Sequence, residues 1–486
     1  MVATVTKPDR RYAWKVTASS FLGNTLEYYD FLVYGTAAAV VFPKVFFPDS
    51  TGFVATLAAF GTFAVGFLAR PLGGLFFGNR GDTHGRKSTL LVTLTVMGIS
   101  TILIGLLPGY ATIGIWAPLL LVLLRLVQGF AVGGEWGGSM IIVLESAPPN
   151  RRGFFTAWPN TGGFSAQILI TLSFAWVYTL PEADLLSWGW RVPFLLSAVI
   201  LVVTFWMRRS LTETPVFTES VAPATEKPGA PAAMKTGRGT IVSTFRDDWR
   251  SLLLILGLRF AESLPYFLLT VFVLSYGNSV LGIERQTLNN AILIVSVLAF
   301  VSHGVFAAVS DRIGRRPVYF FGSVVVFVMA FPFFGLLHTG SFLLITLGYV
   351  LVLNFGHNAI NAVQPAFFAE LFPADRRYTG AAAGREIASI LAGGLTPFVA
   401  TALAGPDGTR WPLVAGYVML GAVLTMIAVW LSPETFRRDL RAGRKYLSVD
   451  DRVARHLAEL DAPDGSGRIA AARVFRRPEP VGTAES

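Results

Sequence analysis

Two copies of one short motif, separated by almost half of the chain, decide the architecture. Residues 81–87 read Gly-Asp-Thr-His-Gly-Arg-Lys, and residues 310–316 read Ser-Asp-Arg-Ile-Gly-Arg-Arg. Both contain Asp-x-x-Gly-Arg followed by a basic residue, and both follow an apolar segment. A second string, Glu-x-x-Pro-x-x-Arg-Arg, occurs at 145–152 and again at 370–377. Because both pairs keep the same order, the chain is predicted to consist of two related halves.

The composition predicts an all-α integral membrane protein. Of the 486 residues, 53% are hydrophobic and only 14% are charged, whereas soluble domains carry about 25% charged residues. The apolar segments are continuous and helix-length, which argues against a β-barrel with its alternating pattern. The absence of cysteine excludes a disulfide-stabilised scaffold. The net charge of +10 comes from basic residues that lie mostly between apolar segments, so we do not expect nucleic acid as a partner.

The apolar segments predict twelve membrane-spanning helices, because one span needs about 20 mostly apolar residues. We place them at residues 17–41, 54–79, 88–107, 116–146, 153–179, 189–209, 251–277, 287–310, 317–338, 341–371, 378–403 and 411–432. The corresponding parts of the chain are a tail at 1–16, a six-helix bundle at 17–210, a linker at 211–250, a second bundle at 251–432 and a tail at 433–486. The first span contains Glu27 and Asp30, so we interpret it as a retained helix and not a cleaved signal peptide.

The loops between the predicted spans also predict the orientation. Arginine and lysine concentrate on one side of the membrane, which is expected to be the cytoplasmic side. That set of loops contains Arg86, Lys87, Arg151, Arg152, Arg208, Arg209, Arg312, Arg315, Arg316, Arg376 and Arg377. The alternate loops contain only Lys44, Arg191, Arg285 and Arg410. With twelve spans, both termini are then expected in the cytoplasm of a cell whose plasma or inner membrane holds the protein.

The chain resembles the major facilitator superfamily through the two Asp-x-x-Gly-Arg motifs. Within it, the sequence is similar to the metabolite:proton symporter family, which includes shikimate, α-ketoglutarate and proline/betaine permeases. The strings that carry this likeness are Gly-Asn-Thr-Leu-Glu-Tyr-Tyr-Asp-Phe at 23–31, Arg-Pro-Leu-Gly-Gly at 70–74, Arg-Leu-Val-Gln-Gly-Phe-Ala-Val-Gly-Gly-Glu-Trp-Gly-Gly at 125–138 and Glu-Leu-Phe-Pro at 370–373. The resemblance implies two pseudo-symmetric bundles, with a substrate site between them near the midplane. Arg385-Glu386 departs from the uncharged aromatic–amide pair of many relatives and leaves the substrate open.

Charged residues inside predicted spans are candidates for the substrate and proton sites, because an isolated charge in a bilayer is costly. Glu27, Asp30 and Tyr34 lie on one face of the first span. They either line a cavity or pair with an arginine that holds two helices together. The remaining candidates are Arg70 in the second span, Arg125, Gln128 and Glu135 in the fourth, Arg259 and Glu262 in the seventh and Asn358 in the tenth.

Several of these candidates have competing interpretations. Arg125 with Gln128 resembles the proton-coupling motif of the superfamily, so Arg125 either tunes a nearby acid or forms a structural bridge. Arg259 and Glu262 are three residues apart and are able to neutralise each other. Arg70 has no acid three or four residues away on its own helix, so its partner is another helix or the substrate. Asn358 belongs to a polar stripe that is either a hydrogen-bond ladder or a substrate-facing wall.

Charged residues at the predicted cytoplasmic helix ends are interpreted as a conformational switch. Carboxylates and arginines there form charge-assisted bridges that break when the two halves move apart. The candidates are Asp82, Gly85, Arg86, Glu145, Arg151, Asp311, Gly314, Arg315, Glu370 and Arg376.

The expected function is proton-coupled import of a small organic acid or zwitterion by alternating access. No nucleotide-binding Gly-x-x-x-x-Gly-Lys-Ser/Thr string and no enzyme signature occur, so neither ATP nor another cofactor is expected. Five scattered histidines predict no metal site. The expected partners are the substrate, protons and the bilayer, with the protein a monomer. The alternatives are a drug/proton antiporter of the same fold and a membrane sensor that binds a metabolite without moving it.

Overall fold

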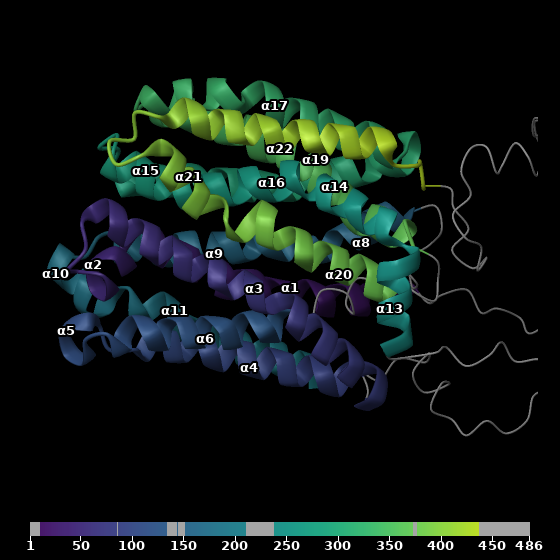
Figure 1. Cartoon of the computed structure of the whole chain (residues 1–486), viewed down its shortest axis with the longest axis horizontal. Helices are drawn as coiled ribbons and strands as arrows, with labels where there is room; N and C mark the ends of the chain where they lie inside the picture. The colour runs from purple at the N-terminus through teal and green to yellow at the C-terminus, as the bar shows by residue number, and fades with distance from the viewer. Residues whose placement is uncertain are drawn as a thin grey trace, which may run out of the picture. The chain divides into compact units, whose positions relative to one another are not determined.

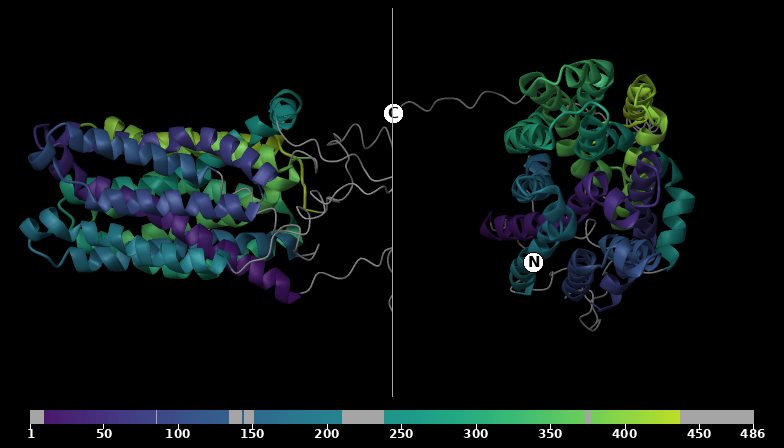
Figure 2. Two further views of the ribbon diagram at one scale, coloured as in Figure 1. Left: turned by 90° about the horizontal axis from the view of Figure 1, so that it is seen from below. Right: turned by 90° about the vertical axis from the view of Figure 1, so that its left-hand side faces the viewer.

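The computed structural model describes residues 10–84, 86–133, 143, 151–209, 238–372 and 377–436, and all of them belong to one compact unit. These residues form helices and contain no β-strand. The long helices lie side by side (Figure 1), and the views from below and from one end show the same arrangement (Figure 2). The predicted all-α membrane fold is therefore confirmed in the part of the chain that is described.

The first half contains six predicted spans. Its helices are α1 (Arg10–Val40), α2 (Phe42–Phe46), α3 (Gly52–His84), α4 (Arg86–Leu106), α5 (Tyr110–Ile113), α6 (Trp116–Val132), α8 (Arg152–Asn160), α9 (Gly162–Val177), α10 (Glu182–Asp184), the π-helical turn η2 (Leu185–Gly189) and α11 (Arg191–Arg209). The predicted span 153–179 is interrupted at Thr161, just after Pro159, which has no backbone N–H to donate. Of the predicted span 116–146, the part after Gly133 lies outside the described residues except for Val143.

The second half repeats this arrangement. Its helices are α13 (Arg238–Asp247), α14 (Trp249–Phe267), η3 (Leu268–Phe272), α15 (Val273–Ser279), α16 (Arg285–Ile313), α17 (Arg315–His338), α18 (Phe342–Tyr349), η4 (Val350–His357), α19 (Asn358–Glu370), α20 (Arg377–Ser389), η5 (Ile390–Gly394), α21 (Thr396–Ala404) and α22 (Trp411–Leu431). The helix α13 lies inside the predicted polar linker 211–250, where we expected no element. Three predicted spans contain a π-helical turn, a local distortion that is common near functional sites.

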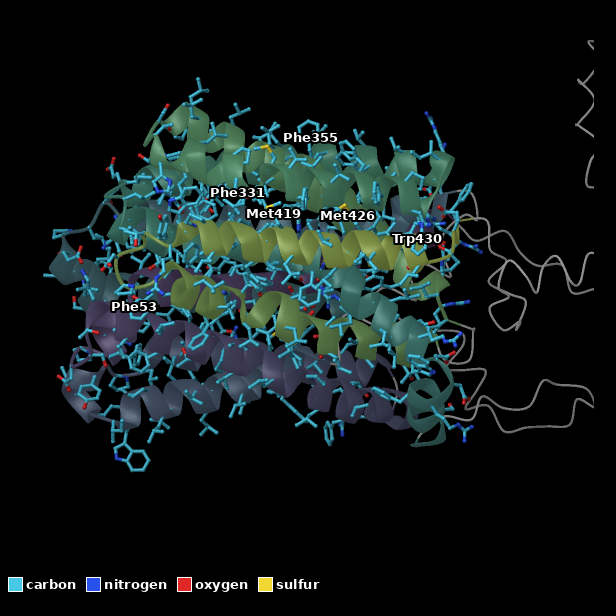
Figure 3. All side chains as sticks on the ribbon, turned by 45° about the horizontal axis from the view of Figure 1, so that its top comes forward. Phe53, Phe331, Phe355, Met419, Met426 and Trp430 are labelled. Atoms are coloured by element: carbon cyan, nitrogen blue, oxygen red, sulfur yellow. The ribbon has the colours of Figure 1, made fainter. Side chains whose placement is uncertain are left out.

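The outward-facing side chains match a lipid environment. Nine helical stretches in the described residues are long and apolar enough to cross a membrane. Large apolar side chains such as Phe331, Phe355 and Trp430 point away from the helices, with Trp430 73% exposed (Figure 3). Exposed apolar patches of this extent are unfavourable in water. The chain is therefore a multi-pass membrane protein.

Close backbone contact joins α3 to α6. A Cβ atom at Gly129 would lie 1.9 Å from the carbonyl oxygen of Gly66, and one at Gly133 would lie 2.0 Å from that of Arg70. Only glycine permits this approach, which is typical of helix packing in membranes. The contact joins the helix that carries Arg70 to the helix that carries Arg125.

Helices of both halves meet at the interface between the halves. In the first half they are α1, α3, α8 and α9, and in the second half they include η3, α15, α16, α19, α20, η5 and α21. The core of the described protein between these helices contains most of the buried charged side chains.

Candidate substrate cavity

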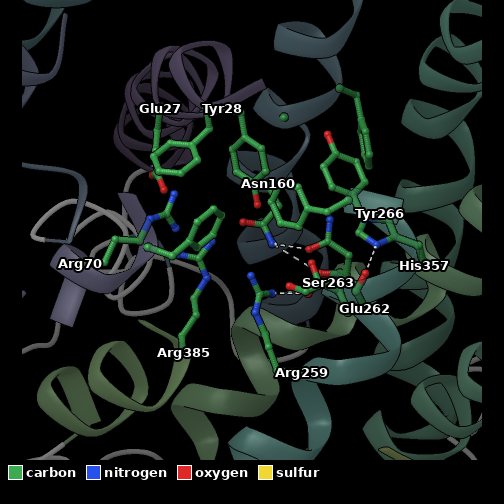
Figure 4. Close-up of a pocket in the computed structure, with 16 residues that line it drawn as sticks. Glu27, Tyr28, Arg70, Asn160, Arg259, Glu262, Ser263, Tyr266, His357 and Arg385 are labelled. Carbon is green, nitrogen blue, oxygen red and sulfur yellow. Dashed lines mark hydrogen bonds and ion pairs between the residues drawn. The ribbon is translucent and has the colours of Figure 1, made fainter. Parts of the chain in front are cut away.

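A cavity lies between the two halves. Figure 4 shows its lining, which comes from α1, α3, α8 and α9 on one side and from α14, η4, α19 and α20 on the other. The polar and charged side chains in this lining are Glu27, Tyr28, Arg70, Asn160, Arg259, Glu262, Ser263, Tyr266, His357, Asn361 and Arg385. A substrate in this cavity would therefore contact both halves at once.

One carboxylate joins the two halves on the side of the cavity where α3 meets α20. Glu386 Oε2 accepts a hydrogen bond from Arg70 Nη1 at 3.4 Å, and Glu386 Oε1 accepts one from Arg385 Nη1 at 2.8 Å. All three side chains are buried, so each charge needs a partner to offset its lost hydration. Glu27 of α1 interacts electrostatically with both Arg70 and Arg385. Two arginines and two acids therefore form one charge cluster.

A second cluster surrounds Arg259 on α14. Its guanidinium pairs with Glu262 one turn along the same helix, as the sequence spacing allowed. It also donates to Gln364 Oε1 at 2.7 Å and, through Nε, to Ser389 Oγ at 3.3 Å. Ser263 Oγ donates to Glu262 Oε2 at 2.9 Å, which further satisfies the buried carboxylate. These contacts hold the Arg259–Glu262 pair in place at the cavity wall.

Aromatic rings support the charged groups. The guanidinium carbon of Arg70 lies 3.8 Å from the centroid of the Phe31 ring, and that of Arg125 lies 3.9 Å from the same centroid. A cation placed over an aromatic face is stabilised electrostatically. On the other side of the cavity, Tyr266 stacks on His357 with 4.9 Å between the ring centroids. The cavity therefore offers flat apolar surfaces next to charged groups.

The predicted substrate and proton residues divide into two groups. Glu27, Arg70, Arg259 and Glu262 line the cavity, and Asn358 lines a smaller cavity that adjoins it. Asp30, Tyr34, Arg125 and Gln128 are buried within the first half and do not line either cavity. Glu135 lies outside the described residues.

The residues of the second group contact one another. Arg125 donates to Gln128 Oε1, and Gln128 Nε2 donates to Thr101 Oγ1 at 2.7 Å and to the backbone oxygen of Asp30 at 3.5 Å. The Arg125 guanidinium also lies 4.3 Å from the centroid of the Tyr34 ring. Arg125 thus contacts an amide of its own helix and an aromatic ring of α1, and its role as a tuner of a nearby acid or as a structural bridge stays a prediction.

The structure adds cavity residues that the sequence did not suggest. Tyr28, Asn160 and Tyr266 line the cavity, yet an aromatic or amide side chain in a membrane span carries no distinctive signal by itself. Arg385 is an unusual charge in the sequence but is not among the predicted site residues. Its position inside the predicted span 378–403 is the signal that points to it.

The predicted switch residues of the second half lie at one end of the interface between the halves. Asp311 on α16 accepts hydrogen bonds from the backbone N–H groups of Gly153 (3.0 Å) and Phe154 (2.9 Å), which begin α8 of the first half. A carboxylate at a helix N-terminus is favoured by the helix dipole. Arg315 Nη1 donates to Asp311 Oδ1 at 2.8 Å and thereby holds the carboxylate in position.

Glu370 extends this cluster. It pairs with Arg315 at 3.4 Å, accepts a hydrogen bond from Thr435 Oγ1 at 2.6 Å and interacts electrostatically with Arg152 of the first half. Gly314 connects α16 to α17 with φ 107°, a backbone conformation that strongly favours glycine.

The other switch candidates are less informative. Arg151 is exposed and directly precedes α8, and Asp82 and Arg86 lie in α3 and α4 with side chains that are not described. Gly85, Glu145 and Arg376 lie outside the described residues.

The opposite end of the interface is bridged by exposed charges. Glu182 of the first half pairs with Lys44 at 2.5 Å and with Arg285 of the second half at 3.4 Å. Contacts between the halves are therefore present on both sides of the cavity.

Comparison with known proteins agrees with this architecture. The model of the family described as "Sugar (and other) transporter" matches residues 15–444. The chain is 38% identical to the shikimate transporter of Escherichia coli (strain K12), over 89% of this chain and 98% of that protein. The chain belongs to the major facilitator superfamily. Within the superfamily it is a member of the metabolite:proton symporter family, which confirms the expected resemblance.

Other members of the superfamily are similar over most of the chain. Identity to the proline/betaine transporter of Escherichia coli (strain K12) is 37%, over 90% of this chain and 86% of that protein. Identity to the citrate-proton symporter of Klebsiella pneumoniae is 33%, over 80% of this chain and 85% of that protein. A solved D-xylose-proton symporter shares the fold, with a TM-score of 0.66 at 17% identity over 90% of this chain and all of that chain. The protein is a membrane transporter and not an enzyme.

Proposed function

We propose that this transporter imports a small organic acid or zwitterionic metabolite together with protons, by alternating access. The observation that carries the proposal is the cavity between the halves, in which guanidinium groups from both halves stand next to buried carboxylates. Arginine offers a planar set of donors that matches a carboxylate. A carboxylate buried in a membrane span is suited to bind and release a proton.

Charge balance links the proton to the substrate. Arg70, Arg385 and Arg259 carry three positive charges, and Glu27, Glu386 and Glu262 carry three negative ones when ionised. An anion entering this balanced cluster would leave a buried excess negative charge, which is unfavourable. Protonation of one acid removes that excess. We assign this role to Glu27, because it lines the cavity and interacts electrostatically with both Arg70 and Arg385.

Alternating access is supported by contacts between the halves at both ends of the cavity. Asp311 contacts α8 at one end and Glu182 contacts Arg285 at the other. Opening the cavity to either side requires one set to break while the other persists. No cofactor is invoked, because the proton gradient supplies the driving force. We further propose a monomer in the cell membrane with both termini in the cytoplasm.

Transport in proteoliposomes tests the proposal. We expect a panel of radiolabelled carboxylates, betaine and sugars to yield a carboxylate or zwitterion that accumulates when the outside is acidic. A protonophore should abolish this accumulation and leave counterflow intact. Efflux driven by an inward proton gradient would indicate an antiporter, and binding without counterflow would indicate a sensor. Accumulation that requires sodium and persists without a proton gradient would contradict the proposal.

A further inference from the structure

A second, smaller cavity adjoins the main one. The two share the side chains of Phe164, Tyr266 and His357, so they form neighbouring compartments of one binding region. The smaller compartment is lined from α9, α14, η3, α16, η4 and α19, again from both halves. Its lining contains no acidic or basic side chain other than His357.

Three polar atoms of the lining have no hydrogen-bond partner among the described residues. They are the Tyr266 hydroxyl, Gln167 Oε1 and Asn358 Oδ1. Their side chains belong to residues that are only 6%, 4% and 1% exposed, respectively. Leaving a buried polar group without a partner is costly, by about 1–3 kcal/mol per group. Three such groups in one small compartment are left for a ligand, or for water that a ligand displaces, to satisfy.

Hydrogen bonds on the far side fix the orientation of Asn358. Its Nδ2 donates to Ser302 Oγ and to Asn354 Oδ1, both at 2.9 Å. Asn354 is itself oriented, because its Nδ2 donates to the backbone oxygen of Val295 at 3.3 Å. Rotating the Asn358 amide would place its oxygen against Asn354 Oδ1, so that two acceptors would face each other. Asn358 therefore presents its carbonyl oxygen to the compartment as a hydrogen-bond acceptor.

Gln167 adds a second amide. In the orientation described its Nε2 donates to Thr171 Oγ1 at 3.3 Å and its Oε1 is a second acceptor. The Tyr266 hydroxyl is able to donate or accept. Two acceptors and one hydroxyl are complementary to donor groups on a ligand. Because no carboxylate lines the compartment, the matching donors are uncharged hydroxyl groups rather than an ammonium group.

We propose that Tyr266, Gln167 and Asn358 form a hydroxyl-binding subsite, so that the preferred substrate is a hydroxylated carboxylic acid. The inference rests on the proposed function, in which the arginines of the main cavity bind the carboxylate. The shared residues Tyr266 and His357 place the subsite directly beside that position. A quaternary ammonium ligand has no N–H or O–H to donate and would leave all three groups without a partner.

Binding of matched acid pairs to the purified transporter in detergent tests the subsite. The pairs are shikimate with cyclohex-1-ene-1-carboxylate, gluconate with hexanoate and lactate with propionate, with glycine betaine in addition. We expect the tightest ligand to be a hydroxylated acid that binds at least about tenfold tighter than its deoxygenated partner. If acids bind but the deoxygenated members or betaine bind as tightly, the subsite is wrong and the carboxylate assignment stands. If no acid binds and neutral sugars do, the proposed function itself fails.

Variants separate a direct contact from a structural effect. Tyr266→Phe removes only the hydroxyl. It should weaken binding of the hydroxylated acid about five- to tenfold and leave binding of the deoxygenated acid unchanged. Asn358→Leu should act in the same direction. Tyr349→Phe is the matched control, because the Tyr349 hydroxyl is equally buried but donates to the backbone oxygen of Leu269 at 2.9 Å. Equal losses for both members of a pair in Tyr266→Phe would overturn the proposal.

Discussion

Arg70 contacts the carboxylate of Glu386 in the second half. Substitutions of Arg70 therefore test most directly whether the substrate carries a carboxylate. Arg70 Nη1 lies 3.4 Å from Glu386 Oε2. The guanidinium carbon lies 3.8 Å from the centroid of the Phe31 ring. In the proposed function, a substrate carboxylate binds next to Arg70.

Replacing Arg70 by lysine tests this position. The substitution Arg70→Lys keeps the charge but loses the planar pair of donors. We expect about tenfold weaker binding of the acid substrate and a smaller loss for its amide or ester, measured by ligand titration. Unchanged binding of the acid would show that Arg70 does not contact the carboxylate.

Glu27 is the proposed proton carrier, and replacing it by glutamine tests how substrate binding depends on pH. In the wild type, anion binding should weaken as pH rises and Glu27 loses its proton, because the negative charge returns to the cluster. Glu27→Gln mimics the protonated form, so binding should become independent of pH at the strong, low-pH level. Counterflow should persist while proton-driven accumulation is lost.

A matched control for this prediction is Asp184→Asn, which removes an exposed carboxylate that lines neither cavity. It should retain proton-driven accumulation. If Glu27→Gln still accumulates substrate against a gradient, another acid carries the proton.

At the scale of elements, α8 is held to the second half at its N-terminus and along its length. Asp311 accepts two N–H bonds at its first turn, His303 contacts the Ala157 oxygen at 3.1 Å, and Asn160 donates to Asn361 Oδ1 at 3.1 Å. These contacts join one helix of the first half to α16 and α19. They must separate when this end of the cavity opens.

Asp311→Asn weakens the interaction with the N-terminus of α8. Loss of the charge should cost about 1 kcal/mol in the conformation described, which shifts the balance between conformations about fivefold. We expect an altered transport rate with substrate affinity largely unchanged, measured by uptake kinetics and binding. Glu434→Gln is the control, because Glu434 accepts from Arg315 and Arg316 N–H within the second half alone.

The close contact between α3 and α6 predicts that a larger residue at Gly129 lowers the stability of the protein. Gly129→Ala inserts a methyl group 1.9 Å from the Gly66 oxygen, so the two helices must separate. We expect a loss of several degrees in the melting temperature in detergent, together with loss of transport. Gly335→Ala on α17 has no atom within 4 Å of the new carbon and should melt at or above the wild-type temperature. Similar melting of both variants would contradict the close contact.

At the scale of the whole molecule, the two ends of the interface differ in chemistry. The Asp311 end uses buried groups and backbone donors, whereas Glu182 at the other end is exposed and pairs with Lys44 and Arg285. Exposed ion pairs contribute less than about 1 kcal/mol and are screened by salt. The Glu182 end is therefore expected to open more easily.

Glu182→Gln should increase the population that is open at this end by up to about fivefold at low salt, and the difference should vanish at high salt. The chain has no cysteine, so spin labels at Ser187→Cys and Ser279→Cys report the separation without background labelling. An unchanged distance distribution at low salt would show that this bridge does not restrain opening.

Most of the fold was predictable because helix length and apolar content are local properties. The two Asp-x-x-Gly-Arg strings predicted two related halves, and the spans lie within several residues of the observed helices, such as α22 at Trp411–Leu431 against 411–432. The break between α8 and α9, the helix α13 and the π-helical turns were not predicted. They depend on how neighbouring helices and prolines redistribute backbone hydrogen bonds.

The sequence by itself determined that charged residues inside spans must face protein, because a bilayer cannot solvate them. It therefore identified Glu27, Arg70, Arg259 and Glu262 as candidates. Only the tertiary structure decided that Glu27 reaches the cavity while Asp30, on the same helical stripe, is enclosed in the first half. It also brought Arg70 to Glu386, 316 positions away in the chain. Such partners depend on how the helices are rotated and packed, and the packing depends on close backbone approach at glycines. The spacing of residues along one helix does not encode either the rotation or the packing.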